Sequence, residues 1–266
     1  MVTALFQPAR AMSETKQDAI RAYYHTLFSA WGRQHWWPAQ SRFEMIMGAY
    51  LTQNTAWTNV EKALGNLRKA RLLTVSGIRR TPQPALEQLI RPAGYFRQKA
   101  QRLKTFVSFL DERYGGSLAG MFAQPTGALR GELLALNGVG PETADSILLY
   151  AGNHPVFVVD AYTRRILERH SIVAASASYD EIRQLFEQAL ARTSPPMQSL
   201  DLVPTRTGPR GSCHRPSCVS RAERSTLVQV LNEMHGLLVG VGKNYCLKSQ
   251  PHCEQCPLQK FLPAAK

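Results

Sequence analysis

Long apolar runs are missing from this sequence of 266 residues, since no stretch approaches the roughly 18 consecutive apolar residues of a membrane-spanning helix. The N-terminal segment also lacks the basic start, apolar block and small-residue cleavage site of a secretion signal. We therefore expect no membrane segment and a cytoplasmic location.

Acidic residues are few, with 19 Asp and Glu against 32 Lys and Arg, which leaves a formal net charge of +13. Such an imbalance favours a polyanionic partner, and nucleic acid is the first candidate. A basic surface that only maintains solubility and an acidic membrane surface are the alternatives.

Cysteine is absent from the first 212 residues. The five cysteines form two groups, Cys213 with Cys218 and then Cys246, Cys253 and Cys256. In a reducing compartment, cysteines grouped in this way indicate a metal site more than disulfides.

Strand-like segments are also almost absent, because the only β-like run, Val156 to Val159, is too short and isolated to build a sheet. Apolar residues instead recur at helical spacing in nearly every segment, for example at Leu103, Phe106 and Leu110. With 44% hydrophobic residues the chain can bury a core. The sequence predicts an all-α protein of one or two domains.

The segment from Thr193 to Arg224 differs in composition, because it is rich in Pro, Gly, Ser and Arg and nearly free of periodic apolar residues. We interpret 193–224 as an exposed, basic and mobile loop. Helical spacing resumes at Leu227 and continues to Leu238, which predicts a last core helix.

Residues 136–148, LNGVGPETADSIL, predict two helices joined by a glycine turn. Gly138 and Gly140 permit the positive φ of a tight turn, and Pro141 suits the first position of a helix. The exposed amides of such a turn, with the positive end of the following helix, can bind one backbone phosphate of a nucleic acid. The simpler interpretation is a plain connection between two helices.

Asp160 follows four apolar residues in the segment PVFVVDAYTRRI. A carboxylate in such a place is costly to bury unless a partner or a reaction uses it. Aspartate is also a favoured N-cap, and a helix can begin at Ala161. Both interpretations can hold together.

These motifs together resemble the endonuclease III, or helix-hairpin-helix-GPD, superfamily of DNA glycosylases. The resemblance covers about residues 30–192 and 226–260, and it rests on Leu51 to Thr55, Gly94 to Leu103, residues 136–148, Asp160 with Arg164 and Arg165, and the C-terminal cysteines. Within the superfamily, several residues resemble the branch that includes monofunctional 3-methyladenine glycosylases. They are Trp36-Trp37-Pro38, Gln53-Asn54-Thr55, Glu142, His235 to Leu238 and Lys243.

The resemblance implies a two-lobed all-α fold. Residues 42–154 would form a six-helix barrel lobe with the helix-hairpin-helix at 133–148. Residues 1–41 and 155–266 would form a second helical lobe, with the basic loop at 193–224 and a Cys-rich loop at 246–256. Such a protein would be a nucleoid-associated monomer that binds double-stranded DNA containing a damaged base in the cleft between the lobes, with no membrane partner.

For catalysis the resemblance implies that Asp160 helps to break the N-glycosidic bond, since a fixed carboxylate stabilises positive charge on the sugar or orients a water. Bifunctional members have a nucleophilic lysine where this chain has Glu142, and glutamate cannot form the imine that leads to strand cleavage. We therefore predict base excision without AP lyase activity, unless another lysine such as Lys243 substitutes. Glu142 itself either faces the base pocket or is solvated in the first turn of a helix, where it suits the dipole.

A target base must leave the DNA stack before a pocket can hold it. Trp36, Trp37, Trp57 and Lys243 are the candidates for a base pocket, because electron-rich rings suit a cationic alkylated purine such as 3-methyladenine. Each Trp could instead be ordinary core. Gln53 is the candidate that fills the gap, and the candidate DNA contacts are Gln53, Asn54, Gly138, Val139, Gly140 and Thr143. We expect Lys99 and Arg102 to lie beside packed helices or backbone phosphates rather than to touch the base.

Cys246, Cys253 and Cys256, at the spacing C-x6-C-x2-C, resemble the first three ligands of the superfamily's [4Fe–4S] loop. Leu262 stands where the fourth cysteine is expected. The alternatives are a cluster with three cysteines, a cluster completed by Cys213, Cys218 or His252, a Cys3His zinc site, and no metal.

The predicted function is a monofunctional DNA glycosylase of base excision repair. A bifunctional glycosylase and AP lyase, a mismatch glycosylase acting on uracil, thymine or adenine, and a non-catalytic damage-binding module remain as rivals. The presence of Asp160 counts against the last of these.

Overall fold

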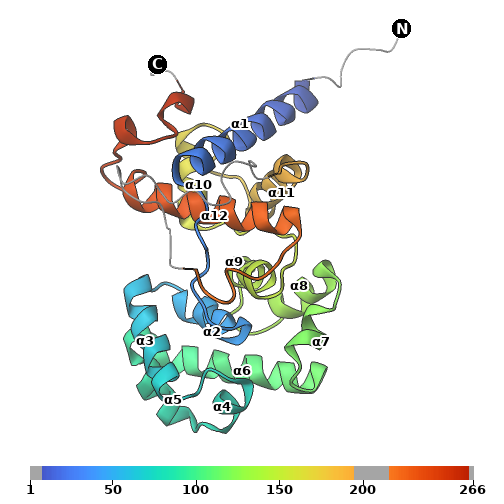
Figure 1. Ribbon diagram of the computed structural model, residues 1–266, viewed down its shortest axis with the longest axis vertical. Helices are drawn as coiled ribbons and strands as arrows, with labels where there is room; N and C mark the ends of the chain where they lie inside the picture. The colour runs from blue at the N-terminus through green and yellow to red at the C-terminus, as the bar shows by residue number, and fades with distance from the viewer. Residues whose placement is uncertain (1–7, 195–215, 264–266) are drawn as a thin grey trace. The chain divides into compact units, whose positions relative to one another are not determined.

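The computed structural model describes residues 8–194 and 216–263, and of residues 8–14 it describes the backbone (Figure 1). Within these ranges the regular structure consists of twelve α-helices and four short 3-10 or π turns, with no strand. The prediction of an all-α fold is confirmed. None of the helices described here is long and apolar enough to cross a membrane.

The chain divides into two compact units, which we call the terminal unit and the central unit. The terminal unit comprises Met1–Trp36, Pro155–Pro216 and Glu223–Lys266. The central unit comprises Trp37–His154 together with Ser217–Ala222.

The central unit is built around a long helix, α6, whose buried face includes Leu103, Phe106 and Leu110. Helices α2, α4, α5 and α7 pack against it (Figure 1). The helices are α2 (Arg42–Thr52), α3 (Trp57–Lys69), α4 (Val75–Arg80), α5 (Gln83–Ile90), α6 (Phe96–Tyr114), α7 (Leu118–Phe122), α8 (Thr126–Leu134) and α9 (Pro141–Ser146), with the 3-10 turn η1 (Arg91–Ala93) between α5 and α6.

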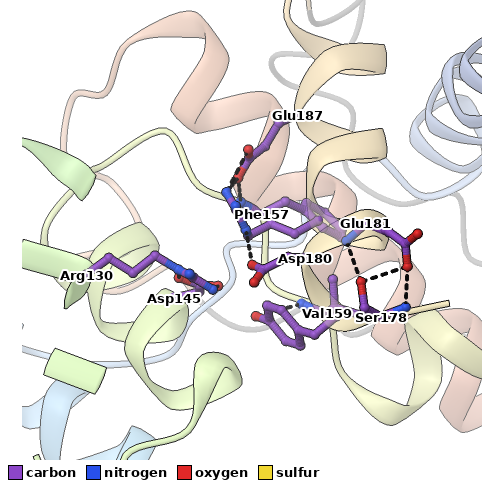
Figure 2. Close-up of polar contacts among 10 residues, drawn as sticks. Arg130, Asp145, Phe157, Val159, Ser178, Asp180, Glu181 and Glu187 are labelled. Carbon is purple, nitrogen blue, oxygen red and sulfur yellow. Dashed lines mark hydrogen bonds and ion pairs between the residues drawn. The ribbon is translucent and has the colours of Figure 1, made fainter. Parts of the chain in front are cut away.

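Helices α8 and α9 form the predicted hairpin, and Pro141 is the first residue of α9 as expected. The two helices are pinned by a buried ion pair, because Arg130 Nε and Nη2 donate to the two carboxylate oxygens of Asp145 at 2.7 and 3.2 Å (Figure 2). Helix α9 continues into a π-helical turn, η2 (Ile147–Ala151), a feature that often marks functional sites.

The terminal unit is built around α12 (Thr226–Asn244), which packs against α1 (Pro8–Trp31), α10 (Ala161–Arg169) and α11 (Tyr179–Leu190). The last core helix that the sequence predicts is therefore confirmed. Gly242 allows a close approach of α10, since a Cβ there would lie 2.3 Å from the Tyr162 ring. The unit ends in the 3-10 turns η4 (Cys253–Gln255) and η5 (Gln259–Phe261).

The apolar run at Val156 to Val159 is buried and irregular rather than a strand. Phe157 stacks on Phe186 of α11 with ring centroids 4.0 Å apart, and its amide donates to Glu187 (Figure 2). Ser178 caps α11 through a capping box with Glu181 (Figure 2). These contacts anchor the segment that leads into Asp160.

Most of the predicted basic loop at 193–224, including Cys213, lies outside the described residues. Of that segment the structure describes Thr193, Ser194 and residues 216–224. Cys218 is exposed, whereas the expectation of exposure is wrong for four residues that are buried: Thr193, Ser217, Val219 and Ser220.

Candidate functional site

Asp160 is the N-cap of α10 in the terminal unit. Its backbone is extended, with φ −100° and ψ 179°, and its Oδ1 accepts a hydrogen bond from the Thr163 amide at 2.7 Å. The side chain is only 13% exposed. The N-cap interpretation is therefore correct, and the cap leaves the second oxygen available for another partner.

That partner is His235, on α12, whose Nε2 lies 3.6 Å from Asp160 Oδ2. This distance is slightly too long for a hydrogen bond. Burial acts to raise the pKa of Asp160, but His235 and then Thr163 outweigh it and hold the pKa below its usual value. The carboxylate is therefore ionised at neutral pH.

Trp36 and Lys243 meet in the same unit, because the Lys243 Nζ lies 5.6 Å from the centroid of the Trp36 ring. The His235 ring packs edge-on against Trp36, with centroids 6.3 Å apart. Gly236 gives Trp36 room, since a Cβ at this position would lie 3.0 Å from the Trp36 Cβ. The structure thus connects Asp160, Trp36 and Lys243 through His235.

Trp37 and Trp57 belong to the central unit, where their rings meet edge to face at 5.1 Å. Tyr150, in η2, lies 5.5 Å from Trp37 on another side. Trp37 and Tyr150 are buried, whereas Trp57 is partly exposed. The core interpretation therefore suits Trp37, and Trp57 presents part of this aromatic cluster to solvent.

The hairpin turn has positive φ at Gly138, where φ is 78°, but not at Gly140, where φ is −93°. The expectation of a positive φ at Gly140 is therefore wrong. A Cβ at Gly138 would lie 2.1 Å from Arg102 Nε, whereas a Cβ at Gly140 would meet nothing within 4 Å. Gly140 thus leaves open space beside the first turn of α9, where a phosphate could approach.

Gln53 joins the loop after α2 to this hairpin. Its Nε2 donates to Gly138 O and to Thr143 Oγ1, both at 2.9 Å, and its Oε1 accepts from Arg102 Nη1 at 2.6 Å. Its side chain is therefore engaged within the central unit. The next residue, Asn54, is exposed at the tip of the loop with φ 49°.

Lys99 braces the same loop from α6. Its Nζ is buried and donates to Leu51 O at 2.8 Å, Thr55 Oγ1 at 2.6 Å and Ala93 O at 2.8 Å. Burial, with the charge of Arg102, lowers the pKa of Lys99 to about 8. As expected, Lys99 serves helix packing, and its three hydrogen bonds leave it no free donor.

Glu142 is exposed in the first turn of α9, next to the buried Thr143. A carboxylate there suits the positive end of the helix. Its position in the fold matches the solvated interpretation, and the base-facing interpretation stays a hypothesis.

Cys246, Cys253 and Cys256 line one cavity together with Leu262. Burial raises the pKa of the Cys256 thiol, and the neighbouring Cys246 and Cys253 raise it further. Arg169, also in the lining, has its Nη1 3.2 Å from Cys246 Sγ. Even so, no set of three or more His, Cys, Asp or Glu in the described residues is arranged to hold a metal ion.

Two further side chains, one in each unit, had no predicted role. His235 occurs in the segment that resembles the 3-methyladenine glycosylase branch, but its pairing with Asp160 depends on how α10 crosses α12. Tyr95, between η1 and α6, is 63% exposed and left-handed at φ 45°, the only large hydrophobic residue exposed in the described part of the chain. Its place after Gly94 in GYFRQ is the only sequence signal that could have indicated it.

Comparisons with known proteins agree with the superfamily that the sequence motifs resemble. A family model described as HhH-GPD superfamily base excision DNA repair protein matches residues 47–192. A Methanocaldococcus jannaschii protein with the name "Putative DNA repair glycosylase" is 38% identical over 251 residues, which cover 94% of this chain and 98% of that protein. The bovine endonuclease III-like protein 1 is 28% identical over 231 residues, or 86% of this chain and 61% of that protein.

Similar solved structures include the H. pylori 3-methyladenine DNA glycosylase bound to 1,N6-ethenoadenine. It matches at 26% identity and a TM-score of 0.64, over 86% of this chain and 97% of that one. A trapped endonuclease III–DNA covalent intermediate has a TM-score of 0.66 over 92% and 95% of the two chains. Because the two sequences are only 21% identical, this likeness shows the fold alone.

Proposed function

The chain belongs to the HhH-GPD superfamily of base excision DNA repair proteins, and on that premise we propose that it is a monofunctional DNA glycosylase. It binds duplex DNA as a monomer, hydrolyses the N-glycosidic bond of a flipped damaged base and leaves an abasic site. The observation that carries the proposal is Asp160, a nearly buried carboxylate kept ionised by its neighbours.

The role of Asp160 follows from its charge. Departure of a base leaves positive charge on the sugar, and a fixed carboxylate in a site of low dielectric stabilises that charge without reorganisation. Since Thr163 holds Oδ1, the carboxylate is oriented before the DNA arrives. A water attacking C1′ then completes the hydrolysis, and the same carboxylate can orient it.

The lack of lyase activity follows from Glu142, since only an amine forms the imine that precedes strand cleavage. Lys99 offers no substitute, because its Nζ is buried and donates to three acceptors. Lys243 lies over the Trp36 ring, and we propose that it packs there rather than acting as the nucleophile. Excision therefore stops at the abasic site.

The best substrate class is a cationic alkylated purine such as 3-methyladenine. Trp57 presents part of an aromatic cluster to solvent, and electron-rich rings attract a cation. The likeness to an H. pylori 3-methyladenine glycosylase supports this class. The ammonium of Lys243 beside the buried Trp36 would repel such a base, so we assign the stacking to Trp57.

The DNA grip consists of the hairpin and the loop after α2. Gly138, Val139 and Gly140 offer backbone amides to one phosphate, with Thr143 in the following turn. Because the Gln53 side chain is engaged internally, we propose that Asn54 is the side chain that enters the gap left by the flipped base.

Duplexes that each carry one lesion and an end label test the reaction. Monofunctional excision gives strand breaks only after hot alkali, and an alkylated purine gives the fastest reaction. Breaks without alkali would contradict the assignment of Glu142, and a fastest reaction on a mismatched uracil or thymine would contradict the substrate class.

Asp160→Asn tests the catalytic residue. We expect excision to fall by at least about 100-fold, the lower range for removing one electrostatic contribution, while affinity for abasic-site DNA is kept. Unchanged excision by a folded variant would remove Asp160 from its role.

Gly140→Ala tests the phosphate grip, with Gly138→Ala as its matched partner. Alanine at 140 suits the backbone and meets open space, so the melting temperature should hold while DNA affinity falls. Alanine at 138 strains a positive φ and collides with Arg102, so stability and affinity should both fall. Normal affinity of Gly140→Ala would contradict the grip.

A [4Fe–4S] cluster is a separate proposal, supported by the common cavity of Cys246, Cys253 and Cys256. These residues supply three of the four thiolates that such a cluster usually takes, and Leu262 has no donor atom. The described donor set is therefore incomplete, and no step above uses the cluster. Iron and sulfide analysis of anaerobically purified protein tests it, because a metal-free sample would refute it.

A further inference from the structure

His235 lies beside Asp160 in the terminal unit and affects the orientation of the Asp160 carboxylate as well as its ionisation. We propose that His235 is a positioning residue for Asp160, holding one carboxylate oxygen while the Thr163 amide holds the other. The inference rests on the proposed function, because it concerns the carboxylate that would stabilise the sugar cation.

The carboxylate is held from two directions. Thr163 donates its amide to Oδ1 at 2.7 Å, within the first turn of α10. His235 Nε2 lies 3.6 Å from Oδ2 and comes from a different helix, α12. A carboxylate has about four lone-pair sites, so two such contacts orient it and leave sites for a substrate or a water.

The imidazole ring is itself held in place. It packs edge-on against Phe157 at 6.1 Å and against Trp36 at 6.3 Å. Its side chain is only 5% exposed. A ring packed on two aromatic neighbours loses little freedom when it meets Asp160, which suits it for positioning.

The electrostatics of Asp160 agree with this geometry. Burial acts to raise its pKa, while the contact with His235 is the largest opposing cause and brings the pKa below its ordinary value. The elements around the pair carry further charged or titratable side chains, among them Tyr24, Arg33, His35, Tyr162, Arg164, Arg165, Tyr179, Arg183, Glu187, Glu233 and Lys243. The shift of Asp160 arises from His235 and Thr163 rather than from these groups.

Removing His235 should therefore change both the ionisation and the orientation of Asp160. His235→Leu removes the ring and its contact with Oδ2, whereas His235→Gln keeps an N–H donor. We expect Leu to raise the pKa of Asp160, because it removes the largest cause that opposes burial. The acid limb of the pH profile for single-turnover excision should move up in His235→Leu and move less in His235→Gln.

The two variants should differ at neutral pH. We expect excision by His235→Leu to fall by at least about tenfold, and His235→Gln to recover most of that loss because its amide still reaches Oδ2. The control is His154→Leu, which removes a buried histidine from the central unit. It should lower stability without moving the acid limb.

Carboxyl-carbon NMR titration of Asp160, assigned with Asp160→Asn, reports the pairing without any activity. A raised pKa in the His235 variants supports the inference even if no lesion is excised, in which case the proposed function fails alone. An unchanged pKa, or a loss of rate with no shift of the acid limb and no recovery in Gln, would overturn the inference.

Discussion

Lys99→Met removes a buried ammonium that braces the loop carrying Gln53 and Asn54. The Lys99 side chain is 1% exposed, and three acceptors, Leu51 O, Thr55 Oγ1 and Ala93 O, lose a donor in the variant. At about 1 kcal/mol for each net hydrogen bond, the lost bonds lower the free energy of unfolding by about 3 kcal/mol. The variant also avoids the cost of burying an ammonium, so the net loss at pH 7 should be smaller than this. Methionine fills a similar volume, so a cavity contributes little.

The dependence on pH has a definite sign. The pKa of Lys99 falls from 10.5 to about 8 in the folded protein, so between these values the unfolded chain binds more protons than the folded one. Stability due to this residue therefore rises with pH through that window. At about 1.4 kcal/mol for each unit, the difference between wild type and Lys99→Met should grow by up to about 3 kcal/mol.

Urea unfolding of both proteins between pH 7 and pH 10 measures this difference, and subtraction cancels the other titrating groups. Lys104→Met is the matched control, because Lys104 lies on the same helix and donates to Ile78 O and Arg79 O but is partly exposed. Lys104→Met should lower the free energy of unfolding by less than about 1 kcal/mol. A difference for Lys99→Met that stays flat or shrinks as the pH rises would refute the reasoning.

Three further outcomes are expected. Asp145→Asn should cost about 3–5 kcal/mol in urea unfolding, because it leaves the Arg130 guanidinium without its buried partner; a loss below about 1 kcal/mol would contradict this. The pKa of Glu233 is raised by burial from 4.5 to about 7, so stability falls as pH rises between these values, and Glu233→Gln should flatten that slope; an unchanged slope speaks against it. Asparagine tolerates the left-handed backbone at residue 95, so the melting temperature of Tyr95→Asn should not change. Its affinity for duplex DNA should fall by about 1–3 kcal/mol if the exposed ring stacks on a base, and an equal affinity excludes that contact.

Local signals in the sequence predicted the elements that short-range physics determines. Pro141 after two glycines predicts the hairpin, and Asp160 before Ala161 predicts the start of α10, because turns and caps depend on neighbouring residues. The regular apolar spacing beyond Leu227 likewise predicts α12.

Contacts between distant segments were not predictable in the same way. Gln53 meets Gly138 across 85 residues, and because of this pairing we propose Asn54 rather than Gln53 for the DNA gap. The meeting of Asp160 with His235 depends on the packing of α10 against α12, which no local pattern encodes. The expected positive φ at Gly140 was wrong because space for a ligand and a positive φ both select glycine, so the residue type alone does not separate them.

Helix α10 is fastened to the region of α12 at two separate points. Asp160, at its start, meets His235, and Arg165 donates to Gly242 O and to Cys246 O. A helix attached twice cannot slide along its neighbour without breaking both attachments. Damage to the Cys-rich loop would therefore leave the contact of Asp160 with His235 as the attachment that keeps α10 in register, although no cysteine takes part in the proposed reaction.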